Sequence, residues 1–214
     1  MMDCRVSAVI LSAGLSTRMG GRFKPLLPLG DTTILGRCID LFSRSGIEKV
    51  FVVTGHRSED VAPAAKELDA APVFNPDYGK GMFSSVVTGL KAASADAEAV
   101  FLLPVDIPLV QTETIERLQA VYRQHRGKLV RPVYRGRQGH PPLIPTSMVS
   151  SIAGWSGPDG LRGALALFET ETVRIAVEDP HILFDVDTPE DYERLQKMRA
   201  AMGQRMGKLS LSPV

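Results

Sequence analysis

A glycine-rich segment that carries three basic residues lies close to the start of the sequence. It reads LSAGLSTRMGGRFK over residues 11–24. Glycines permit a tight loop with exposed backbone N–H groups, which can cradle phosphates, and Arg18 and Lys24 add positive charge to such a loop. Without these charges, a structural turn would be the simpler interpretation. The segment matches neither the P-loop pattern G-x-x-x-x-G-K-[ST] nor the dinucleotide pattern G-x-G-x-x-G, so it predicts a phosphate site of another kind.

Acidic residues in two later segments could hold a divalent cation beside those phosphates. Asp106 directly follows a hydrophobic run, and Asp185 and Asp187 lie in a segment that we expect to be a strand running into the last helix. Ligands of open parallel sheets bind beyond the carboxyl ends of strands, where carboxylates can hold Mg²⁺ on nucleotide phosphates. On a strand, Asp185 and Asp187 would share one face. We predict Asp106 and Asp187 as Mg²⁺ ligands, with Asp185 as the alternative to Asp187.

A simpler interpretation exists for each of these carboxylates. Asp106 could be an ordinary turn residue, and the later pair could merely favour the N-terminus of the following helix. Thr188, however, already supplies the N-cap of that helix, with Pro189 at its first position and Asp191 completing a capping box. Asp187 is therefore not needed as a cap.

Basic residues are concentrated in the stretch between Glu116 and Asp159, which contains no acidic residue. It holds seven basic ones: Arg117, Arg123, Arg126, Lys128, Arg131, Arg135 and Arg137. The formal net charge of the chain is only +1, so a local basic surface favours a small anionic ligand over a nucleic acid. His140 follows in the turn-like segment GHPPL and could join this anion site or be structural. The first three arginines could equally lie on a solvated helix face.

The elements that must position these residues alternate between apolar strands and helices. Such alternation predicts a mostly parallel sheet that is covered by helices on both faces. From about residue 128 the pattern changes to short strands and Pro/Gly turns, which predicts a substrate-facing portion over 128–165 of the same domain. We expect strands at 6–11, 50–53, 72–74 and 100–103, and helices at 34–42, 61–68 and 83–93, around 115–122 and from 189.

Length and composition exclude several classes of protein. The chain has 214 residues, of which 44% are hydrophobic and 23% charged, values typical of a folded domain. We expect one domain over 1–199 and a fraying tail over 200–214. Cys4 and Cys38 are not spaced as metal ligands, which favours a reducing cytoplasm. The absence of a long apolar run argues against a membrane partner.

The motifs, in this order, resemble the molybdenum-cofactor nucleotidyltransferases. That family opens with L-x-x-G-x-S-x-R-M-G followed by K-x-L-L, which here are residues 11–20 and 24–27. The resemblance extends from residue 6 to about 197. It implies an α/β, Rossmann-like three-layer fold of the nucleotidyltransferase type, with a mostly parallel mixed sheet. The further matching segments are NPDY (75–78), GMFSS (81–85), DIP (106–108), GHP (139–141), GPDGLR (157–162) and DVDTPED (185–191).

This resemblance also implies roles for individual residues. The catalytic group would be Lys24, Arg18 and Asp106. The acceptor would contact Arg131, Arg135, His140 and Arg162. The nucleotide would contact Leu11, Ala13, Gly14, Gly20, Lys24, Ser84, Ser85 and Asp106.

The cytidylyl branch of the family is more similar than the guanylyl branch. Guanylyl members tend to have glycine at the positions of Ala13 and Ser85, and asparagine at those of Asp185 and Asp187. The loop over 20–24, in contrast, has the guanylyl length. The implied reaction transfers CMP from CTP to the phosphate of a molybdopterin-type cofactor, with Mg²⁺, and releases pyrophosphate. The product would serve a molybdenum-containing oxidoreductase.

Three alternatives stay open at this point. The chain could be a nucleotidyltransferase that uses GTP or a sugar- or alcohol-phosphate acceptor. The D-x-D sequence at 185–187 also occurs in glycosyltransferases, although there it usually lies in mid-chain. The chain could also be a non-enzymatic carrier of a pterin cofactor. Release of pyrophosphate would exclude the carrier, and the identity of the acceptor would separate the transferases.

Overall fold

The core of the molecule is one mixed, mostly parallel sheet. The computed structural model describes residues 4–209, with side chains for residues 4–201. The strand order is β10-β7-β9-β6-β1-β4-β5, with β8 paired to β7, while β2 and β3 form a separate hairpin. The strands are β1 (Val6–Ser12), β2 (Pro28–Leu29), β3 (Thr32–Thr33), β4 (Lys49–Thr54), β5 (Ala71–Phe74), β6 (Ala99–Pro104), β7 (Leu129–Tyr134), β8 (Arg137–Gln138), β9 (Leu143–Pro145) and β10 (Thr172–Ala176).

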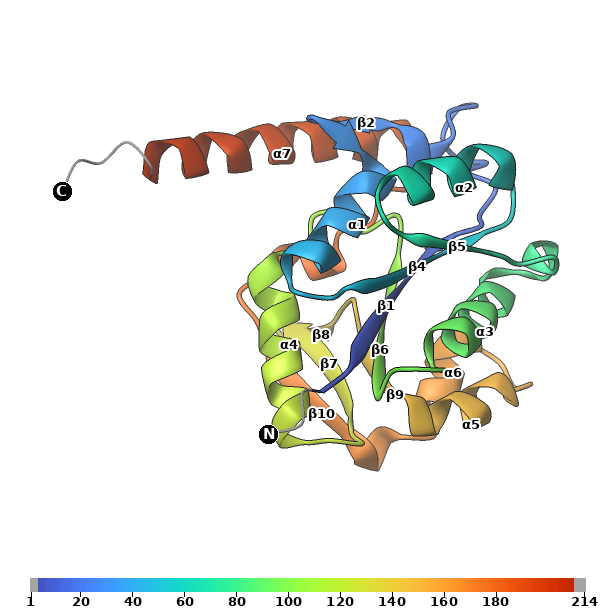
Figure 1. The fold of residues 1–214 in the computed structure, drawn as a ribbon. Coiled ribbons are helices and arrows are strands. Elements are labelled where there is room, and N and C mark those ends of the chain that lie inside the picture. Colours follow the sequence, from blue (N-terminus) through green and yellow to red (C-terminus); the bar gives the residue numbers. More distant parts are fainter. Residues whose placement is uncertain (1–3, 210–214) are drawn as a thin grey trace.

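Helices cover both faces of this sheet, which confirms the predicted three-layer α/β fold (Figure 1). Residues of α1, α2, α4 and α7 pack in the hydrophobic core on one face, and residues of α3, α5 and α6 pack in the core on the other. The helices are α1 (Ile34–Arg44), α2 (Ser58–Glu67), α3 (Met82–Ala93), α4 (Thr112–Gln124), α5 (Val149–Ala153), α6 (Gly160–Ala166) and α7 (Pro189–Leu209).

The central strand β1 shows why the sequence of the sheet is so apolar. Ala8 and Ile10 contribute to the core on the first face, and Val9 and Leu11 contribute to the core on the second. Both faces of the strand are therefore buried, as is usual for parallel sheets. β1 pairs in parallel with β4 on one side and β6 on the other. The loops that follow β1 and β6 thus leave the same edge of the sheet, where ligands of this class of fold bind.

The predicted strand over Asp185 and Asp187 is wrong. β6 already has β1 and β9 as its two neighbours. A strand over residues 185–187 therefore has no free edge of β6 with which to pair. The segment is instead held by a hydrogen bond in which the Val186 N–H donates to the Asp106 carbonyl oxygen at 2.9 Å. Val186 is fully buried, and this contact fixes both carboxylates beside the loop that follows β6.

The predicted capping box of α7 is confirmed. The Asp191 N–H donates to Thr188 Oγ1 at 3.2 Å, and the Thr188 N–H donates to Asp191 Oδ2 at 3.1 Å. The helix continues to Leu209, beyond the end expected near Arg199. Residues 210–214 of the expected tail lie outside the described residues.

The portion over 128–165 supplies strands to the same sheet and the helices α5 and α6 to its second face. β10, which was not predicted from the sequence, adds a parallel edge strand beside β7. Within residues 4–209, none of the helices combines the length and the apolar character needed to cross a membrane.

Candidate active site

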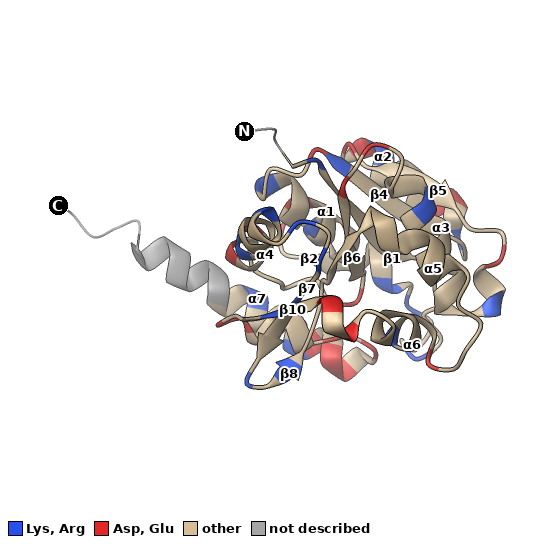
Figure 2. Ribbon diagram, turned by 90° about the horizontal axis from the view of Figure 1, so that it is seen from below, with Lys and Arg blue, Asp and Glu red and all other residues tan. Residues whose placement is uncertain are grey.

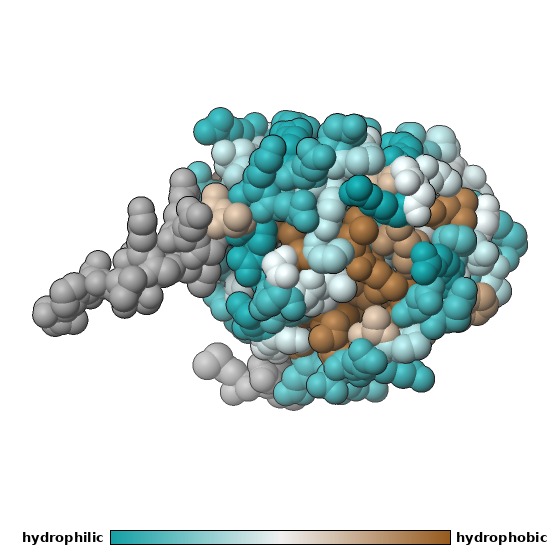
Figure 3. Space-filling view, turned by 90° about the horizontal axis from the view of Figure 1, so that it is seen from above, coloured by the Kyte–Doolittle hydropathy of each residue, from teal (hydrophilic) through white to brown (hydrophobic). Residues whose placement is uncertain are grey.

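Two adjoining cavities open where the carboxyl ends of β1 and β6 meet. The smaller, of about 550 Å³, is lined by the loop after β1 and by the start of α3. The larger, of about 1060 Å³, lies towards β7, β10 and α6. Seen from above in Figure 3, hydrophobic side chains gather in the middle of the face and hydrophilic ones surround them. Four residues line both cavities: Leu11, Met82, Pro104 and Asp106.

An ionic cluster lies in the smaller cavity. Lys24 Nζ donates to Asp187 Oδ1 at 3.0 Å and lies 3.5 Å from Asp106 Oδ2. Arg18 Nη1 lies 3.0 Å from Asp187 Oδ2. The Lys24 side chain is only 10% exposed, whereas that of Arg18 is 72% exposed. The structure therefore brings together the four charged residues singled out for phosphate and metal binding, and it pairs them with one another.

Burial is the main influence on the Asp106 carboxyl group. It raises the pKa of Asp106, and the neighbouring carboxylates of Asp187 and Asp185 raise it further, while Lys24 lowers it. Because the charged form is disfavoured by burial, a cation next to Asp106 stabilises it. The site thus holds a partly compensated negative charge at the point where the two cavities meet.

The glycine-rich loop owes its shape to three positive φ angles, at Ser16 (53°), Gly20 (61°) and Gly21 (80°). Met19 is fully buried and anchors the loop. The Lys24 N–H donates to Ser16 Oγ at 3.3 Å. Gly20, predicted to contact the nucleotide, is not among the residues that line either cavity; its left-handed backbone instead turns the loop.

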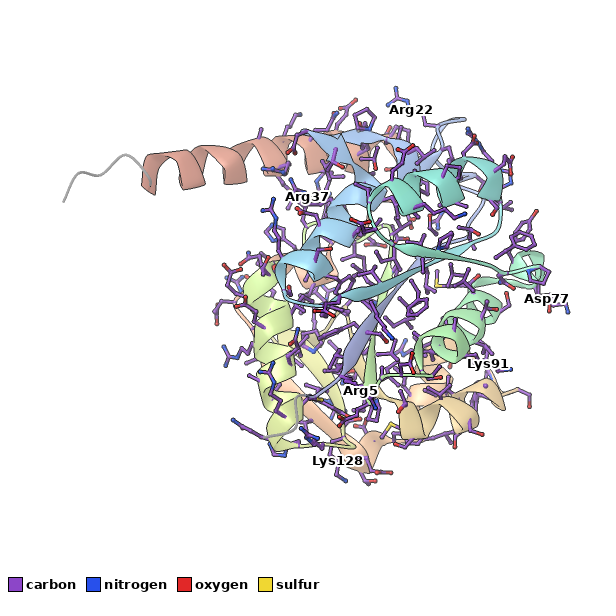
Figure 4. The ribbon with its side chains drawn as sticks, viewed as in Figure 1. Arg5, Arg22, Arg37, Asp77, Lys91 and Lys128 are labelled. Atoms are coloured by element: carbon purple, nitrogen blue, oxygen red, sulfur yellow. The ribbon has the colours of Figure 1, made fainter. Side chains whose placement is uncertain are left out.

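Aromatic contacts hold the end of this loop. The Phe23 ring lies edge-on to His56, with centroids 5.8 Å apart, and under the Arg57 guanidinium at 4.5 Å. Phe23 directly precedes Lys24, so these contacts help to fix the lysine. Arg22, the third basic residue of the loop, points away from the body of the molecule (Figure 4).

The two serines predicted to contact the nucleotide have different surroundings. Ser85 is buried and lines the smaller cavity. Ser84 does not line it. Asn75 Nδ2 donates to both hydroxyl oxygens at 2.9 Å, and Ser84 Oγ lies 2.9 Å from the carbonyl oxygens of Asp77 and Gly81. Ser84 therefore fixes the turn before α3, and of the two serines only Ser85 lines the smaller cavity.

The acceptor residues predicted from the sequence are only partly brought together. Arg131, His140 and Arg162 line the larger cavity. Arg135 does not: it lies in the β7–β8 turn with φ of 48°, and its guanidinium lies 5.2 Å over the Tyr134 ring. The positive φ at this turn directs Arg135 away from the cavity, and the next arginine along the chain lines it instead. Arg137 belongs to the predicted basic stretch although it was not named as an acceptor contact, and Arg174 is a cavity arginine that the sequence does not single out.

His140 is an uncharged group in this cavity. Burial lowers its pKa, a hydrogen bond with the Leu102 backbone raises it, and the nearby Arg131 lowers it. A histidine with a lowered pKa is neutral at pH 7. Its Nδ1 atom is buried without a hydrogen-bond partner, so His140 offers a neutral polar contact to a ligand rather than a positive charge.

Asp106 and Asp187 could supply the oxygen ligands of a divalent cation. Both approach the same lysine nitrogen, at 3.5 and 3.0 Å, so their carboxylates converge. Mg²⁺ is commonly bound by one or two carboxylates together with substrate phosphates and water, and this pair fits that requirement. Among residues 4–209 there is no group of three or more His, Cys, Asp or Glu residues that could hold a metal.

Asp187 and Asp185 are expected to differ in their effect on metal dependence. Asp187 lines the smaller cavity beside Lys24, whereas Asp185 lines the larger one. We expect Asp187→Ala to raise the Mg²⁺ concentration for half-maximal rate about tenfold or more, and Asp185→Ala to raise it less. Steady-state rates across a Mg²⁺ titration measure both. A larger shift in the Asp185 variant would reverse the assignment.

Comparison with known proteins identifies the family. Residues 8–175 match the model of the MobA-like NTP transferase domain. The chain is 29% identical over 188 residues to the molybdenum cofactor cytidylyltransferase of Escherichia coli, covering 87% of this chain and 93% of that one. It is also 29% identical over 198 residues to the nicotine blue oxidoreductase of Paenarthrobacter nicotinovorans, covering 89% and 96%.

Solved structures agree with this result. A crystal structure of Rv0371c from Mycobacterium tuberculosis has a TM-score of 0.76 and 26% identity, over 92% of this chain and 100% of that one. Another structure of that protein, at a TM-score of 0.71 and 25% identity over 91% and 98%, is described as its complex with manganese. Since the family model spans more than half of the sequence, the chain belongs to the MobA-like NTP transferases and is a nucleotidyltransferase.

Proposed function

We propose that this nucleotidyltransferase transfers CMP from CTP to the phosphate of a molybdopterin-type cofactor and releases pyrophosphate. The observation that carries the proposal is the pair of cavities that meet at Asp106. The smaller has a cationic loop suited to a triphosphate, and the larger has arginines suited to an anionic acceptor. A reaction between two anionic substrates needs both sites side by side.

The chemistry follows from the positions of these residues. An oxygen of the acceptor phosphate attacks the α-phosphorus, a new P–O bond forms, and the bond from the α-phosphorus to the bridging oxygen breaks. A phosphate monoester is already ionised at pH 7, so no general base is required. Lys24 and Arg18 would neutralise the phosphates as pyrophosphate leaves, and catalysis is positioning and electrostatic stabilisation.

Mg²⁺ is the cofactor that we propose, with Asp106 and Asp187 as its protein ligands. When bound, a divalent cation neutralises charge on phosphate oxygens and orients them. The description of the mycobacterial relative as a manganese complex supports a divalent cation in this family.

The preference for CTP rests on the walls of the smaller cavity. Ala13 and Ser85 line it, each at most 6% exposed. Their side chains take up space that glycine would leave open, which favours the smaller pyrimidine ring over a purine.

CTP is therefore expected to give a kcat/KM about tenfold or more above that of GTP. Pyrophosphate release with the four nucleoside triphosphates and molybdopterin measures this. Ala13→Gly should narrow the difference by admitting GTP, whereas Ala70→Gly, at a buried alanine on the opposite face of the sheet, should leave the ratio unchanged. Equal use of both nucleotides, or a preference for GTP, would contradict the proposed base.

The same experiment tests the other candidates. A pyrophosphate signal that appears only with a sugar phosphate or an alcohol phosphate would replace the proposed acceptor. Binding of molybdopterin without release of pyrophosphate under any condition would favour the carrier. The relative named as an oxidoreductase has the same identity as the cytidylyltransferase, so identity alone does not decide between the two activities, and the two adjoining anion-binding sites favour transfer.

A further inference from the structure

We infer that the Tyr192 hydroxyl is a positioning group of this active site. It holds the start of α7 against the chain that follows Lys24, and it thereby sets how the Asp187 carboxylate meets Lys24 and Asp106. The inference rests on the proposed function, because it concerns the carboxylate pair proposed to bind the divalent cation. Tyr192 is not among the residues that line either cavity, so it acts through Asp187 and not by contact with a substrate.

The Tyr192 hydroxyl joins two segments that lie 164 positions apart in the chain. Tyr192 belongs to the first turn of α7 and is 6% exposed. Its hydroxyl donates to the carbonyl oxygen of Pro28, the first residue of β2, at 2.6 Å, and it accepts from Gln196 Nε2 at 3.1 Å. Figure 1 shows β2 lying against α7. Because this nearly buried hydroxyl both donates and accepts, its position is closely defined.

The same turn of α7 holds the backbone of Asp187. Asp191 Oδ2 accepts from the N–H groups of Asp187 and Thr188, at 3.3 and 3.1 Å. Asp191 directly precedes Tyr192, and the Tyr192 N–H donates to the Thr188 carbonyl oxygen at 3.1 Å. A displacement of this helical turn would therefore carry Asp187 with it.

On the other side, the Pro28 carbonyl group is tied closely to Lys24. The Leu27 N–H donates to the Lys24 carbonyl oxygen at 3.1 Å and closes a short 3₁₀ helix directly before Pro28. Lys24 Nζ in turn donates to Asp187 Oδ1 at 3.0 Å. The contacts thus form a closed ring, of which the Tyr192 hydroxyl is one link.

The charged residues of the site depend on such links because the central strands carry none of them. β1 and β6 contain no Lys, Arg, Asp or Glu residue, and they are tan in Figure 2. Lys24, Asp106 and Asp187 all lie outside the strands. Mutation of a residue that orients a metal ligand from outside typically changes metal affinity by about 10–100-fold. A contact that fixes Asp187 is therefore expected to influence metal binding.

Two other contacts hold this region, and neither does what the hydroxyl does. Arg199 Nη2 lies 3.9 Å from Asp31 Oδ1 in the β2–β3 turn, but the Asp31 side chain is 83% exposed, and exposed ion pairs contribute little. The hydrogen bond from the Val186 N–H to Asp106 fixes the chain on the N-terminal side of Asp187. The link through Tyr192 fixes its C-terminal side.

Tyr192→Phe tests the inference, because it removes the hydroxyl and keeps the buried ring. Manganese chloride would be titrated calorimetrically into the full chain without nucleotide. We expect the Mn²⁺ affinity to fall about fivefold or more, as for the loss of a group that orients a metal ligand. In turnover assays, the Mg²⁺ concentration for half-maximal rate should rise by a similar factor.

Tyr122→Phe is the matched control. Tyr122 on α4 is 2% exposed, and its hydroxyl donates to the Glu98 carbonyl oxygen at 3.2 Å, so this variant also loses a hydrogen bond to a backbone oxygen. Both variants should lower Tm by about 2–4 °C, and only Tyr192→Phe should weaken Mn²⁺ binding. Equal weakening in the two variants, or unchanged Mn²⁺ affinity in Tyr192→Phe, would overturn the inference.

A double-mutant cycle shows whether the hydroxyl acts through Asp187. When Asp187→Ala is already present, Tyr192→Phe should cause no further change in the Mg²⁺ concentration for half-maximal rate. A change as large as in the parent background would show that the hydroxyl acts through the fold as a whole, and it would overturn the inference.

The metal titration needs neither CTP nor an acceptor, so its result is independent of the proposed reaction. If no acceptor gives pyrophosphate, the proposed function fails, while the Mn²⁺ titrations still decide on Tyr192. If the parent transfers CMP as proposed and Tyr192→Phe binds Mn²⁺ as the parent does, the inference alone fails. Absence of Mn²⁺ binding to the parent, with and without nucleotide, would overturn the inference together with the proposed metal site.

Discussion

Asparagine in place of Asp106 is expected to reduce turnover about 100-fold or more while leaving the fold intact. Asp106 is the charged residue among the four that line both cavities, and Lys24 is 3.5 Å from its carboxylate. Loss of a metal-binding carboxylate removes about 3–5 kcal/mol of transition-state stabilisation. Initial rates at saturating Mg²⁺ measure the effect, and activity within about fivefold of the parent would contradict the assignment.

The same substitution is expected to raise stability at neutral pH. Burial raises the pKa of Asp106, so the folded state disfavours the charged form that the unfolded state accepts. Below the pKa that Asp106 has in the unfolded state, its carboxyl group is protonated in both states and the free energy of unfolding is highest. As the pH rises from that value through the higher pKa of the folded state, the free energy of unfolding falls. Thermal unfolding should show a higher Tm for Asp106→Asn than for the parent at pH 7, and the difference should shrink as the pH is lowered.

Lys24→Ala is expected to have the second largest effect. The buried ammonium group neutralises Asp106 and Asp187 and is well placed to bind a phosphate. Removing one buried charge partner costs about 3 kcal/mol or more, so both Tm and turnover should fall. Arg18→Ala should lower turnover with little loss of stability, because its ion pair is exposed and such pairs contribute little.

Metal binding separates the role of Lys24 from a purely structural one. Without the competing ammonium, the two carboxylates should bind Mn²⁺ more tightly in Lys24→Ala, as measured by titration without nucleotide. Lys49→Ala is the control, because Lys49 pairs with Asp96 and is 57% exposed. It should change neither turnover nor metal affinity. Unchanged turnover and nucleotide affinity in both Lys24→Ala and Arg18→Ala would show that this loop is not the phosphate site.

The sequence predicts that Lys24 and Asp106 lie close together because both follow strand ends. Lys24 and Asp106 belong to loops that follow two adjacent parallel strands, and apolar runs reveal such strands. Asp187 was placed near them on a motif, although its segment is not a strand. The hydrogen bond from Val186 to Asp106 that brings it there joins distant parts of the chain, and no local pattern encodes it.

The acceptor side could be predicted less well because side-chain direction there depends on turns and on edge pairing. Arg135 and Arg137 are two residues apart, yet only Arg137 lines the cavity, since Arg135 lies in the turn itself with a positive φ, whereas Arg137 begins β8. Arg174 lies on an edge strand, β10, whose alternating pattern is short and was not recognised. Its presence depends on pairing with β7, which is a tertiary contact.

The pairing of Lys24 with Asp187 spans 163 positions of the chain, and this separation has a consequence for the order of folding. Contacts between distant residues form late, because a large loop must close first. During synthesis, the loop that carries Lys24 emerges early. Asp187 emerges only after all strands of the sheet have been made. Gain of nucleotide binding should therefore lag behind the packing of Trp155, a partly buried residue, against the core on the second face of the sheet. A fluorescent nucleotide would report the last stage at which this protein becomes native.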